Sequence, residues 1–138
     1  MVRKLFVYLA YSACNSGALN EDNIMCNKSV LDEITSKVVQ AARESLGDKL
    51  DKVILYGSYA RGDYDDESDI DIMVLADIPR EACGDEYKKI NKFVSRLGLE
   101  HDILVYVDIT DLTTFNKFIN DLPFYMNVQS EGVVLSAQ

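Results

Sequence analysis

A Gly-Ser pair and an Asp-x-Asp pair, ten residues apart, are the parts of this sequence whose residue types and spacing suggest chemistry. Gly57 and Ser58 follow an apolar segment, where a glycine permits a sharp turn and the close approach of a ligand. If a short helical turn begins at Ser58, its free backbone N–H groups and the serine hydroxyl can bind an anion such as phosphate. Arg61 adds a cation suited to phosphate. On its own, such a short segment is more often a plain connecting turn.

Asp69 and Asp71 form the second half of the pattern. Alternate residues of a strand point to the same side with their Cα atoms about 6–7 Å apart, so two carboxylates can hold a hard cation between them. Mg²⁺ prefers such oxygen ligands and keeps positions open for substrate phosphates. A bare Asp-x-Asp is more often a solvated strand end. Asp71, however, lies inside an otherwise apolar segment, where an uncompensated carboxylate would be costly.

Two carboxylates leave a divalent ion under-coordinated, so a third acidic residue is expected from a neighbouring strand. Asp102 opens the next predicted strand, and we prefer it as the third ligand. Asp108 is the competing candidate, since it shares strand parity with Asp102 but lies nearer the following turn and helix. A solvent-facing aspartate at the strand edge is the alternative interpretation of Asp102.

Hydrophobic periodicity predicts the elements that position these residues. Ser29 is the expected N-cap of the first helix, and Gly47 and Gly98 are expected to stop the first and second helices. The second strand is expected to place its isoleucines on one side and its aspartates on the other. The expected strands span residues 52–56, 69–76, 102–109 and 132–135, and the expected helices span residues 29–47, 81–97 and 111–120.

This element order predicts an α+β (α/β) fold, with a small mixed β-sheet packed by helices. About a dozen residues join the first two strands, which permits an antiparallel pair and makes a parallel crossover marginal. We expect residues 29–138 to form the domain and residues 1–28 an N-terminal extension, loosely packed or forming an extra strand. Residues 1–11 also have the outline of an export signal, although the cleavage site is poor, and Met25 is an alternative start.

Composition excludes several classes of function. The 138 residues argue for one domain, and the apolar run near the N-terminus is too short to span a membrane. A net charge of −9 argues against a protein that coats nucleic acid. The three cysteines lie far apart and indicate reduced thiols in the cytoplasm. A single histidine, His101, excludes catalytic triads and zinc clusters built on several histidines.

Together, Gly57-Ser58 and Asp69-x-Asp71 resemble the signature of the DNA polymerase beta-type nucleotidyltransferase superfamily. The run Gly-Ser-Tyr-Ala-Arg-Gly, followed by Ser-Asp-Ile-Asp, is most similar to the minimal nucleotidyltransferases. The resemblance spans roughly residues 29–135. It implies a nucleotidyltransferase core that moves AMP from ATP to a hydroxyl acceptor while pyrophosphate leaves.

The resemblance also implies roles for residues and a need for metal. Two Mg²⁺ ions are expected to neutralise the triphosphate and align the attacking oxygen. The implied nucleotide-binding residues are Gly57, Ser58 and Arg61, and the implied catalytic and metal-binding residues are Asp69, Asp71 and Asp102, with Asp102 a candidate base.

Minimal nucleotidyltransferases often act as antitoxins beside HEPN-type ribonuclease toxins, by attaching AMP to a tyrosine hydroxyl. The leading hypothesis is therefore a cytoplasmic protein adenylyltransferase whose partner is a HEPN-type toxin. The acidic chain disfavours long nucleic acid as the acceptor. Two alternatives stay open, namely an antitoxin that blocks its partner by contact alone and an enzyme that adenylylates a small molecule such as an aminoglycoside.

Overall fold

The computed structural model describes residues 21–137, with side chains from residue 28 onward. The expected export signal and most of the expected N-terminal extension lie outside the described residues, as do the side chains of Cys14 and Cys26. Cys83 carries a free thiol, as expected from the sequence. Across residues 21–137, no helix combines the length and the apolar character that crossing a membrane requires.

A four-stranded mixed sheet forms the centre of the described chain, with the strand order β3-β2-β1-β4. Strand β1 pairs antiparallel with β2 and with β4, whereas β2 and β3 run parallel. The predicted α+β fold is therefore confirmed, and the short connection between the first two strands does form an antiparallel pair. The strands are β1 (Leu50–Tyr56), β2 (Ile70–Ala76), β3 (Val105–Asp111) and β4 (Val133–Ala137).

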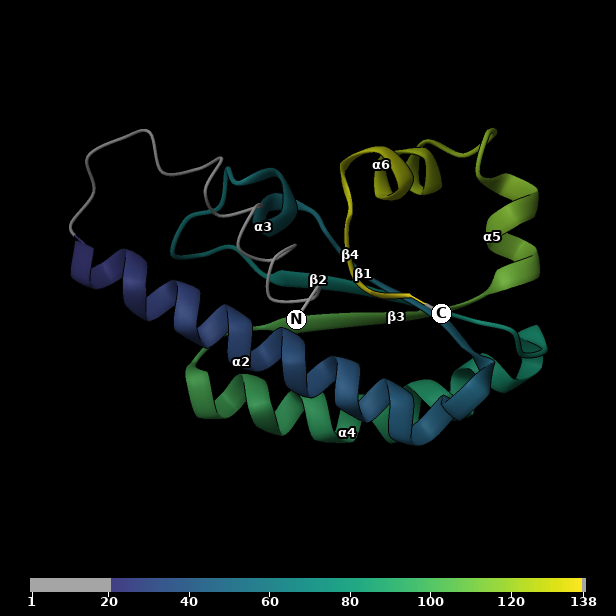
Figure 1. Ribbon diagram of the computed structural model, residues 1–138, viewed down its shortest axis with the longest axis horizontal. Helices are drawn as coiled ribbons and strands as arrows, with labels where there is room; N and C mark the ends of the chain where they lie inside the picture. The colour runs from purple at the N-terminus through teal and green to yellow at the C-terminus, as the bar shows by residue number, and fades with distance from the viewer. Residues whose placement is uncertain (1–20, 138) are drawn as a thin grey trace.

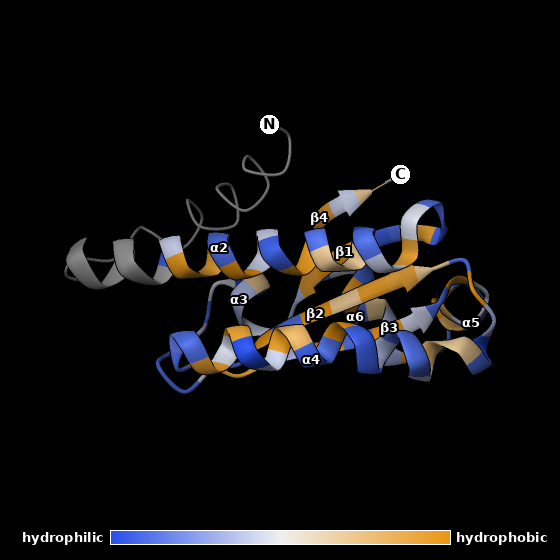
Figure 2. Cartoon of the chain, turned by 90° about the horizontal axis from the view of Figure 1, so that it is seen from below, coloured by the Kyte–Doolittle hydropathy of each residue, from blue (hydrophilic) through white to orange (hydrophobic). Residues whose placement is uncertain are grey.

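Helices cover both faces of the sheet (Figure 1). Helices α2 and α4 lie on one face, α5 and α6 lie on the other, and the short α3 follows β1 at one end of the sheet. Helices α2 and α4 turn most of their hydrophobic residues toward the sheet (Figure 2). The helices are α2 (Glu21–Leu46), α3 (Ser58–Arg61), α4 (Cys83–His101), α5 (Leu112–Phe118) and α6 (Pro123–Glu131), with 3₁₀ turns at η1 (Gly47–Lys49) and η2 (Arg80–Ala82).

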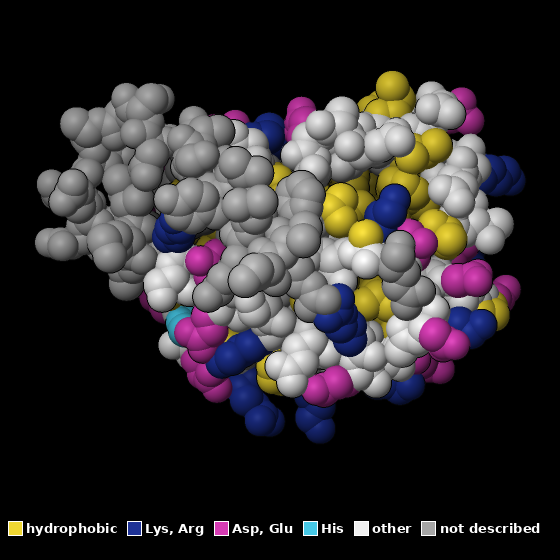
Figure 3. All heavy atoms as spheres, in the orientation of Figure 1, with side chains coloured by type: hydrophobic (Ala, Val, Ile, Leu, Met, Phe, Trp, Pro, Cys, Tyr) yellow, Lys and Arg dark blue, Asp and Glu magenta, His cyan; other side chains and the backbone are white. Residues whose placement is uncertain are grey.

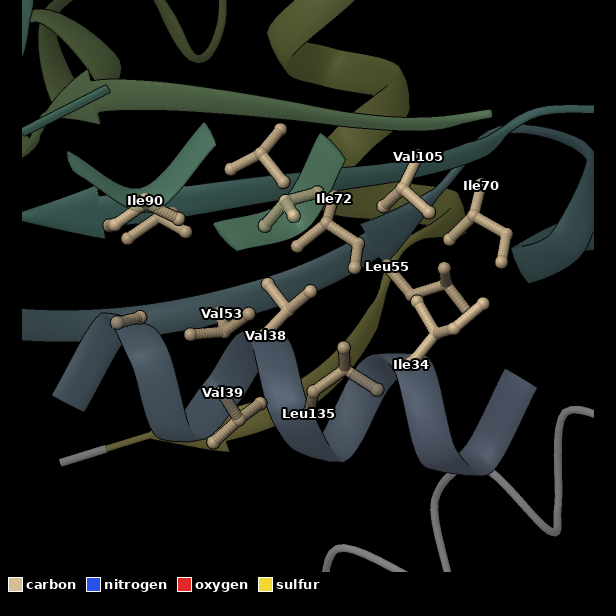
Figure 4. Packing of buried hydrophobic residues seen from close by; sticks show 14 of the residues in the cluster. Ile34, Val38, Val39, Val53, Leu55, Ile70, Ile72, Ile90, Val105 and Leu135 are labelled. Carbon is tan, nitrogen blue, oxygen red and sulfur yellow. The ribbon is translucent and has the colours of Figure 1, made fainter. Parts of the chain in front are cut away.

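The two faces of β2 belong to two different hydrophobic clusters. Ile70 and Ile72 pack with α2 and α4 in the larger cluster (Figure 4). Met73, on the opposite side, packs with Phe115 of α5 and Val128 of α6 in the smaller one. The predicted alternation along this strand is thereby confirmed. Its consequence is that Asp71, which shares the side of Met73, faces the layer of α5 and α6.

Helix α2 begins earlier than the sequence predicts. It starts at Glu21, so Ser29 lies inside the helix and is not its N-cap. Residues 21–28, which were expected to belong to the N-terminal extension, are thus part of this helix. The predicted end is confirmed, since Leu46 closes the helix and Gly47 adopts a φ of 56°.

Helix α4 ends later than the sequence predicts. Gly98 does not stop it, because this glycine lies in the helix and lets the following backbone pass close by. A Cβ atom at Gly98 would lie only 2.6 Å from the carbonyl oxygen of Ile103. The helix continues to His101, and Asp102 ends it in the left-handed conformation, with a φ of 52°. The next strand therefore begins at Val105 and not at residue 102.

Helix α6 was not predicted. Pro123 occupies its first turn, a position where proline is favoured because its missing N–H has no intrahelical partner there. The sequence therefore contained a start signal. The apolar residues that follow have no clear helical period, since several of them face solvent while Val128 alone is fully buried.

Candidate active site

The Gly-Ser segment connects β1 to α3 and has the predicted helical turn. Gly57 has a φ of 73°, a conformation that favours glycine. Its carbonyl oxygen accepts hydrogen bonds from the N–H groups of Ala60, at 3.1 Å, and Arg61, at 3.0 Å. Gly62 ends the turn in the left-handed conformation and donates its N–H to the carbonyl of Ser58, at 2.8 Å.

The open end of this turn lies beside a carboxylate. The N–H groups of Ser58 and Tyr59 precede the first intrahelical hydrogen bond, which leaves them directed away from the helix. Tyr56 at the end of β1 pairs with Asp71 on β2. A Cβ atom added to Gly57 would collide with Oδ2 of Asp71, so the glycine backbone lies directly against this carboxylate. The structure thus brings the predicted phosphate-binding turn and the acidic strand together.

The acidic pair is electrostatically unfavourable without a cation. Burial raises the pKa of Asp71 above its ordinary value of 3.8, and the negative charge of Asp69 raises it further. The positive charge of Arg61 acts in the opposite direction, as the smallest of the three effects. Asp69 lies directly before β2 and is exposed, whereas Asp71 is half-buried. A pair of like charges that is partly buried and that solvent can reach is a fitting place for a positive ion.

The structure places the two candidates for the third carboxylate differently. Asp102 ends α4 and lies outside every strand, so the prediction that it opens the third strand is wrong. Asp108 lies within β3, where it pairs with Met73 of the parallel strand β2. Because Met73 and Asp71 share one side of β2, Asp108 lies on the same side of the sheet as Asp71. We call this side, with Tyr56, Asp71, Tyr106 and Asp108, the carboxylate face.

Tyr56 links the two carboxylates of this face. Burial raises its pKa, and the negative charges of Asp71 and then Asp108 raise it further. Its ring packs edge-on against Phe124 of α6, with 5.6 Å between the centroids. Asp108 also accepts a hydrogen bond on Oδ2 from the hydroxyl of Thr110, at 3.0 Å. The hydroxyl of Thr110 thus orients Asp108 on the carboxylate face. Neither Tyr56 nor Phe124 was predicted to lie at the site.

Helices α5 and α6 border the carboxylate face on one side. Tyr125 packs edge-on against Phe115 at 5.4 Å, and burial and the charge of Asp108 raise its pKa. Hydrophobic side chains gather over this part of the molecule (Figure 3). The acidic residues are thus next to an apolar wall, which lowers the local dielectric and strengthens electrostatic interactions at the site.

Arg61 points toward two acidic side chains. Its Nε lies 3.3 Å from Asp63, and its Nη1 lies 3.4 Å from Glu131. All three side chains are substantially exposed, so each pair contributes only about 0–1 kcal/mol. The guanidinium group is therefore available to a stronger anion.

The donor set fits magnesium better than zinc or another transition metal. Among the described residues, no group of three or more His, Cys, Asp and Glu side chains is arranged to hold a metal ion. Asp69 and Asp71 instead offer one pair of hard oxygen donors beside the N–H groups of α3. Mg²⁺ is commonly bound in this way, through one or two carboxylates, with water and substrate phosphates as its other ligands.

A sequence model of the family described as "Nucleotidyltransferase domain" matches residues 35–134, a range that includes the phosphate-binding turn and the carboxylate face. The chain belongs to this family. The nucleotidyltransferase fold predicted from the motif is thereby confirmed, and the order of its elements accounts for the spacing of the motif. The Gly-Ser pair follows one strand, while Asp69 directly precedes its antiparallel neighbour and Asp71 lies within it.

Curated relatives of this nucleotidyltransferase come from Methanocaldococcus jannaschii. "Putative protein adenylyltransferase MJ0141" is 46% identical over 80 residues, which cover 58% of this chain and 79% of that protein. "Putative protein adenylyltransferase MJ0604" is 35% identical over 97 residues, which cover 70% of this chain and 89% of that protein.

A solved structure shares the fold of this nucleotidyltransferase. It is described as "a putative nucleotidyltransferase from Sulfolobus solfataricus" and superposes with a TM-score of 0.59. The alignment covers 90% of this chain and 94% of that chain at 20% sequence identity. At this identity the likeness concerns the mixed sheet and its helices only.

Proposed function

We propose that this nucleotidyltransferase transfers AMP from ATP to a tyrosine hydroxyl of a partner protein, a HEPN-type toxin, and so acts as an antitoxin. The single observation that carries the proposal is the contact of Gly57 with the carboxylate of Asp71, which joins an anion-binding turn to an acidic pair. The names of the curated relatives support adenylyl transfer to a protein. The resemblance of the motif to minimal nucleotidyltransferases supports the choice of partner.

Each part of the site has a role in this reaction. The N–H groups and hydroxyl of the α3 turn bind the β- and γ-phosphates, with Gly57 allowing close approach and Ser58 adding a donor. Asp69 and Asp71 hold Mg²⁺. When bound, Mg²⁺ offsets the charge of the triphosphate and of the leaving pyrophosphate. The tyrosine oxygen bonds to the α-phosphorus, the bond to the pyrophosphate oxygen breaks, and the hydroxyl proton leaves.

Asp108 replaces Asp102 as the third carboxylate of the proposed site. It lies on the carboxylate face, on the far side of Asp71 from the phosphate-binding turn. An acceptor oxygen that approaches the α-phosphate from the side opposite the pyrophosphate therefore arrives near Asp108, which can accept its proton. Asp102 stays the alternative candidate for the third carboxylate, but it lies outside the sheet, at the end of α4.

Arg61 is proposed to contact the phosphates when ATP binds. Its two exposed ion pairs are weak, whereas a guanidinium–phosphate contact is bidentate and charge-assisted. An exchange of partners from Asp63 and Glu131 to the triphosphate therefore lowers the free energy. Since ATP and Mg²⁺ are supplied in the cytoplasm, we place the reaction there.

The test is incubation of the protein with Mg²⁺ and ATP labelled at the α-phosphate, in lysate of the source organism. We expect a labelled protein band with the wild type, and none with the Asp69→Asn/Asp71→Asn double variant. Asp66→Asn, which changes an exposed aspartate of the same loop, is the matched control and should label like the wild type. Mass spectrometry of the band then identifies the modified residue.

Other outcomes favour the two alternatives. If the double variant neutralises the partner as well as the wild type does, neutralisation proceeds by contact and not by catalysis. If label appears only on small molecules of the lysate, such as an aminoglycoside added to it, the acceptor is not a protein. Either result contradicts the proposed function.

A further inference from the structure

A hollow of about 410 Å³ lies where α4 ends and β3 begins. Leu99 and Leu104 line it, and both are strongly exposed, at 84% and 62%. Gly98 and Ile103 form part of its wall. Large aliphatic side chains that are grouped around a hollow and left in water typically mark a binding surface.

This surface continues along β3 to the carboxylate face. The carbonyl oxygen of Leu104 accepts a hydrogen bond from the N–H of Ile70, at 2.9 Å, so the backbone is already held to β2 at this point. Counting in steps of two, Leu104, Tyr106 and Asp108 therefore share one side of the chain. Tyr106 is 57% exposed and pairs with Asp71. Two exposed side chains, Leu104 and Tyr106, thus connect the hollow, which lies on the α4 side of the sheet, with the carboxylate face on the other side.

The hollow lies at one edge of the sheet, at the end where the phosphate-binding turn is found. Strand β3 is an edge strand, and β1, with the phosphate-binding turn, lies two positions away. The start of β3 and the end of α4 lie at the same end of the sheet as α3 (Figure 1). With the triphosphate over α3, an acceptor protein that binds along the outer edge of β3 lies beside the strand that carries Asp108.

The hollow also has a charge preference. Asp102 lines it and is exposed, in the left-handed conformation that ends α4. Glu100 lies two residues earlier and is exposed as well. The whole chain has a net charge of −9, so a partner of opposite charge is attracted from a distance.

We propose that Leu99, Asp102, Leu104 and Tyr106 form the docking surface for the acceptor protein. The segment that docks has an apolar side chain that enters the hollow, a lysine or arginine that pairs with Asp102, and the acceptor tyrosine. This inference rests on the proposed adenylyl transfer and names the surface and the chemistry of the segment that it recognises.

The test uses synthetic peptides with one tyrosine each. One peptide has leucine and arginine beside the tyrosine, a second has leucine and glutamate, and a third has asparagine and arginine. Incorporation of label from α-labelled ATP is compared as a ratio between peptides, which cancels any general loss of activity. For the wild type we expect the first peptide to be labelled at least about fivefold more than the others, because an anchor residue typically contributes more than about 1 kcal/mol.

Two variants test which residue of the docking surface causes the preference for arginine and which causes the preference for leucine. Asp102→Lys should reverse the charge preference, so that the glutamate peptide becomes the better acceptor. Leu104→Asn should abolish the preference for leucine and keep the preference for arginine. Phe93→Asn, at an exposed position of α4 that does not line the hollow, and Asp85→Lys, at the other end of α4, are controls that should keep the wild-type ratios.

The possible failures are distinguishable. Equal labelling of the three peptides by the wild type, or unchanged ratios in the Asp102 and Leu104 variants, overturns the docking surface and leaves adenylyl transfer intact. Tyrosine amide is included as an acceptor without flanks. If the wild type labels neither this compound nor any peptide nor any protein of the lysate, the proposed function is contradicted, and the docking surface with it.

Discussion

Asp71 has a carboxylate whose charge the surrounding protein disfavours. Burial, the charge of Asp69 and close packing against Gly57 all act on it, and Arg61 offsets them only in part. In proteins, such residues typically serve a function at the expense of stability. At the scale of single residues, substitution of Asp71 should therefore change stability and activity in opposite directions.

The first prediction is that Asp71→Asn stabilises the metal-free protein and abolishes transfer. The folded-state pKa of Asp71 is raised, so the folded protein binds its proton more tightly than the unfolded chain does. The stability of the wild type relative to the variant should therefore fall as pH rises from 3.8, the ordinary pKa, through the folded-state pKa. Tm measured with EDTA across this range checks the sign, with Asp66→Asn as control. A Tm lower than that of the wild type at neutral pH would contradict the prediction.

The second prediction separates the two candidates for the third carboxylate. Asp108→Asn should lower the rate of AMP transfer by about 100-fold or more, the size expected for a lost general base. Asp102→Asn should change the rate of transfer to tyrosine amide by no more than about threefold, because Asp102 lies outside β3. Steady-state rates at saturating ATP measure both. The reverse ranking would restore Asp102 to the site.

At the scale of elements, two glycines determine how neighbouring helices and strands are arranged around the site. Gly57 ends β1 with a positive φ and touches Asp71, so it forms both the turn and the contact. Gly98 lets the backbone after α4 cross the helix closely, and this crossing sets where β3 begins. The bounds of β3 in turn leave Asp102 outside the sheet and include Asp108, on the same side of the sheet as Asp71.

The third prediction concerns the turn between β1 and α3. Gly57→Ala should lower Tm by several degrees, since an alanine at positive φ costs about 1–2 kcal/mol and its Cβ collides with Asp71. Gly84→Ala is the matched control, because Gly84 lies in α4 with nothing within 4 Å of an added Cβ. This control should keep or raise Tm, as alanine is the better helix former. Equal stability of the two variants would contradict the strained geometry of Gly57.

At the scale of the whole molecule, the two faces of the sheet make different contributions to stability and function. Helices α2 and α4 bury one face completely and form the larger cluster, which holds the strands in register. Helices α5 and α6 cover only part of the other face, where the smaller cluster lies beside the carboxylate face. Stability thus comes mainly from one side of the sheet, which leaves the other side able to carry unfavourable charge.

The fourth prediction is that Mg²⁺ with ATP stabilises the whole fold through this face. A ligand that binds only the folded state adds about 2.7 kcal/mol at 100 times its Kd, which corresponds to several degrees in Tm for a chain of this size. We expect this rise for the wild type and for Asp66→Asn, and no rise for Asp69→Asn/Asp71→Asn. Thermal unfolding with Mg²⁺ alone, with ATP alone and with both measures it. An equal rise in the double variant would show binding elsewhere.

The sequence by itself determined the features that depend on local geometry. A strand alternates its side chains, so the apolar spacing of β2 was enough to place Asp71 opposite Ile70 and Ile72. A glycine followed by serine at the end of an apolar strand suggested a helical turn, with a plain connecting turn as the alternative, and the structure shows the helical turn at α3. The resemblance to the family signature rests on these two segments and on their separation along the chain.

Only the tertiary structure decided where α4 ends and hence which acidic residue lies beside Asp71. The helix continues past Gly98 because the packed backbone of Ile103 favours a glycine there, a contact between residues that no local propensity encodes. Helix α6 likewise depends on burial of Val128 against the sheet and not on its own periodicity. Long-range packing free energy exceeds the small propensity differences of single residues, and for this reason the position of Asp108 could be read only from the fold.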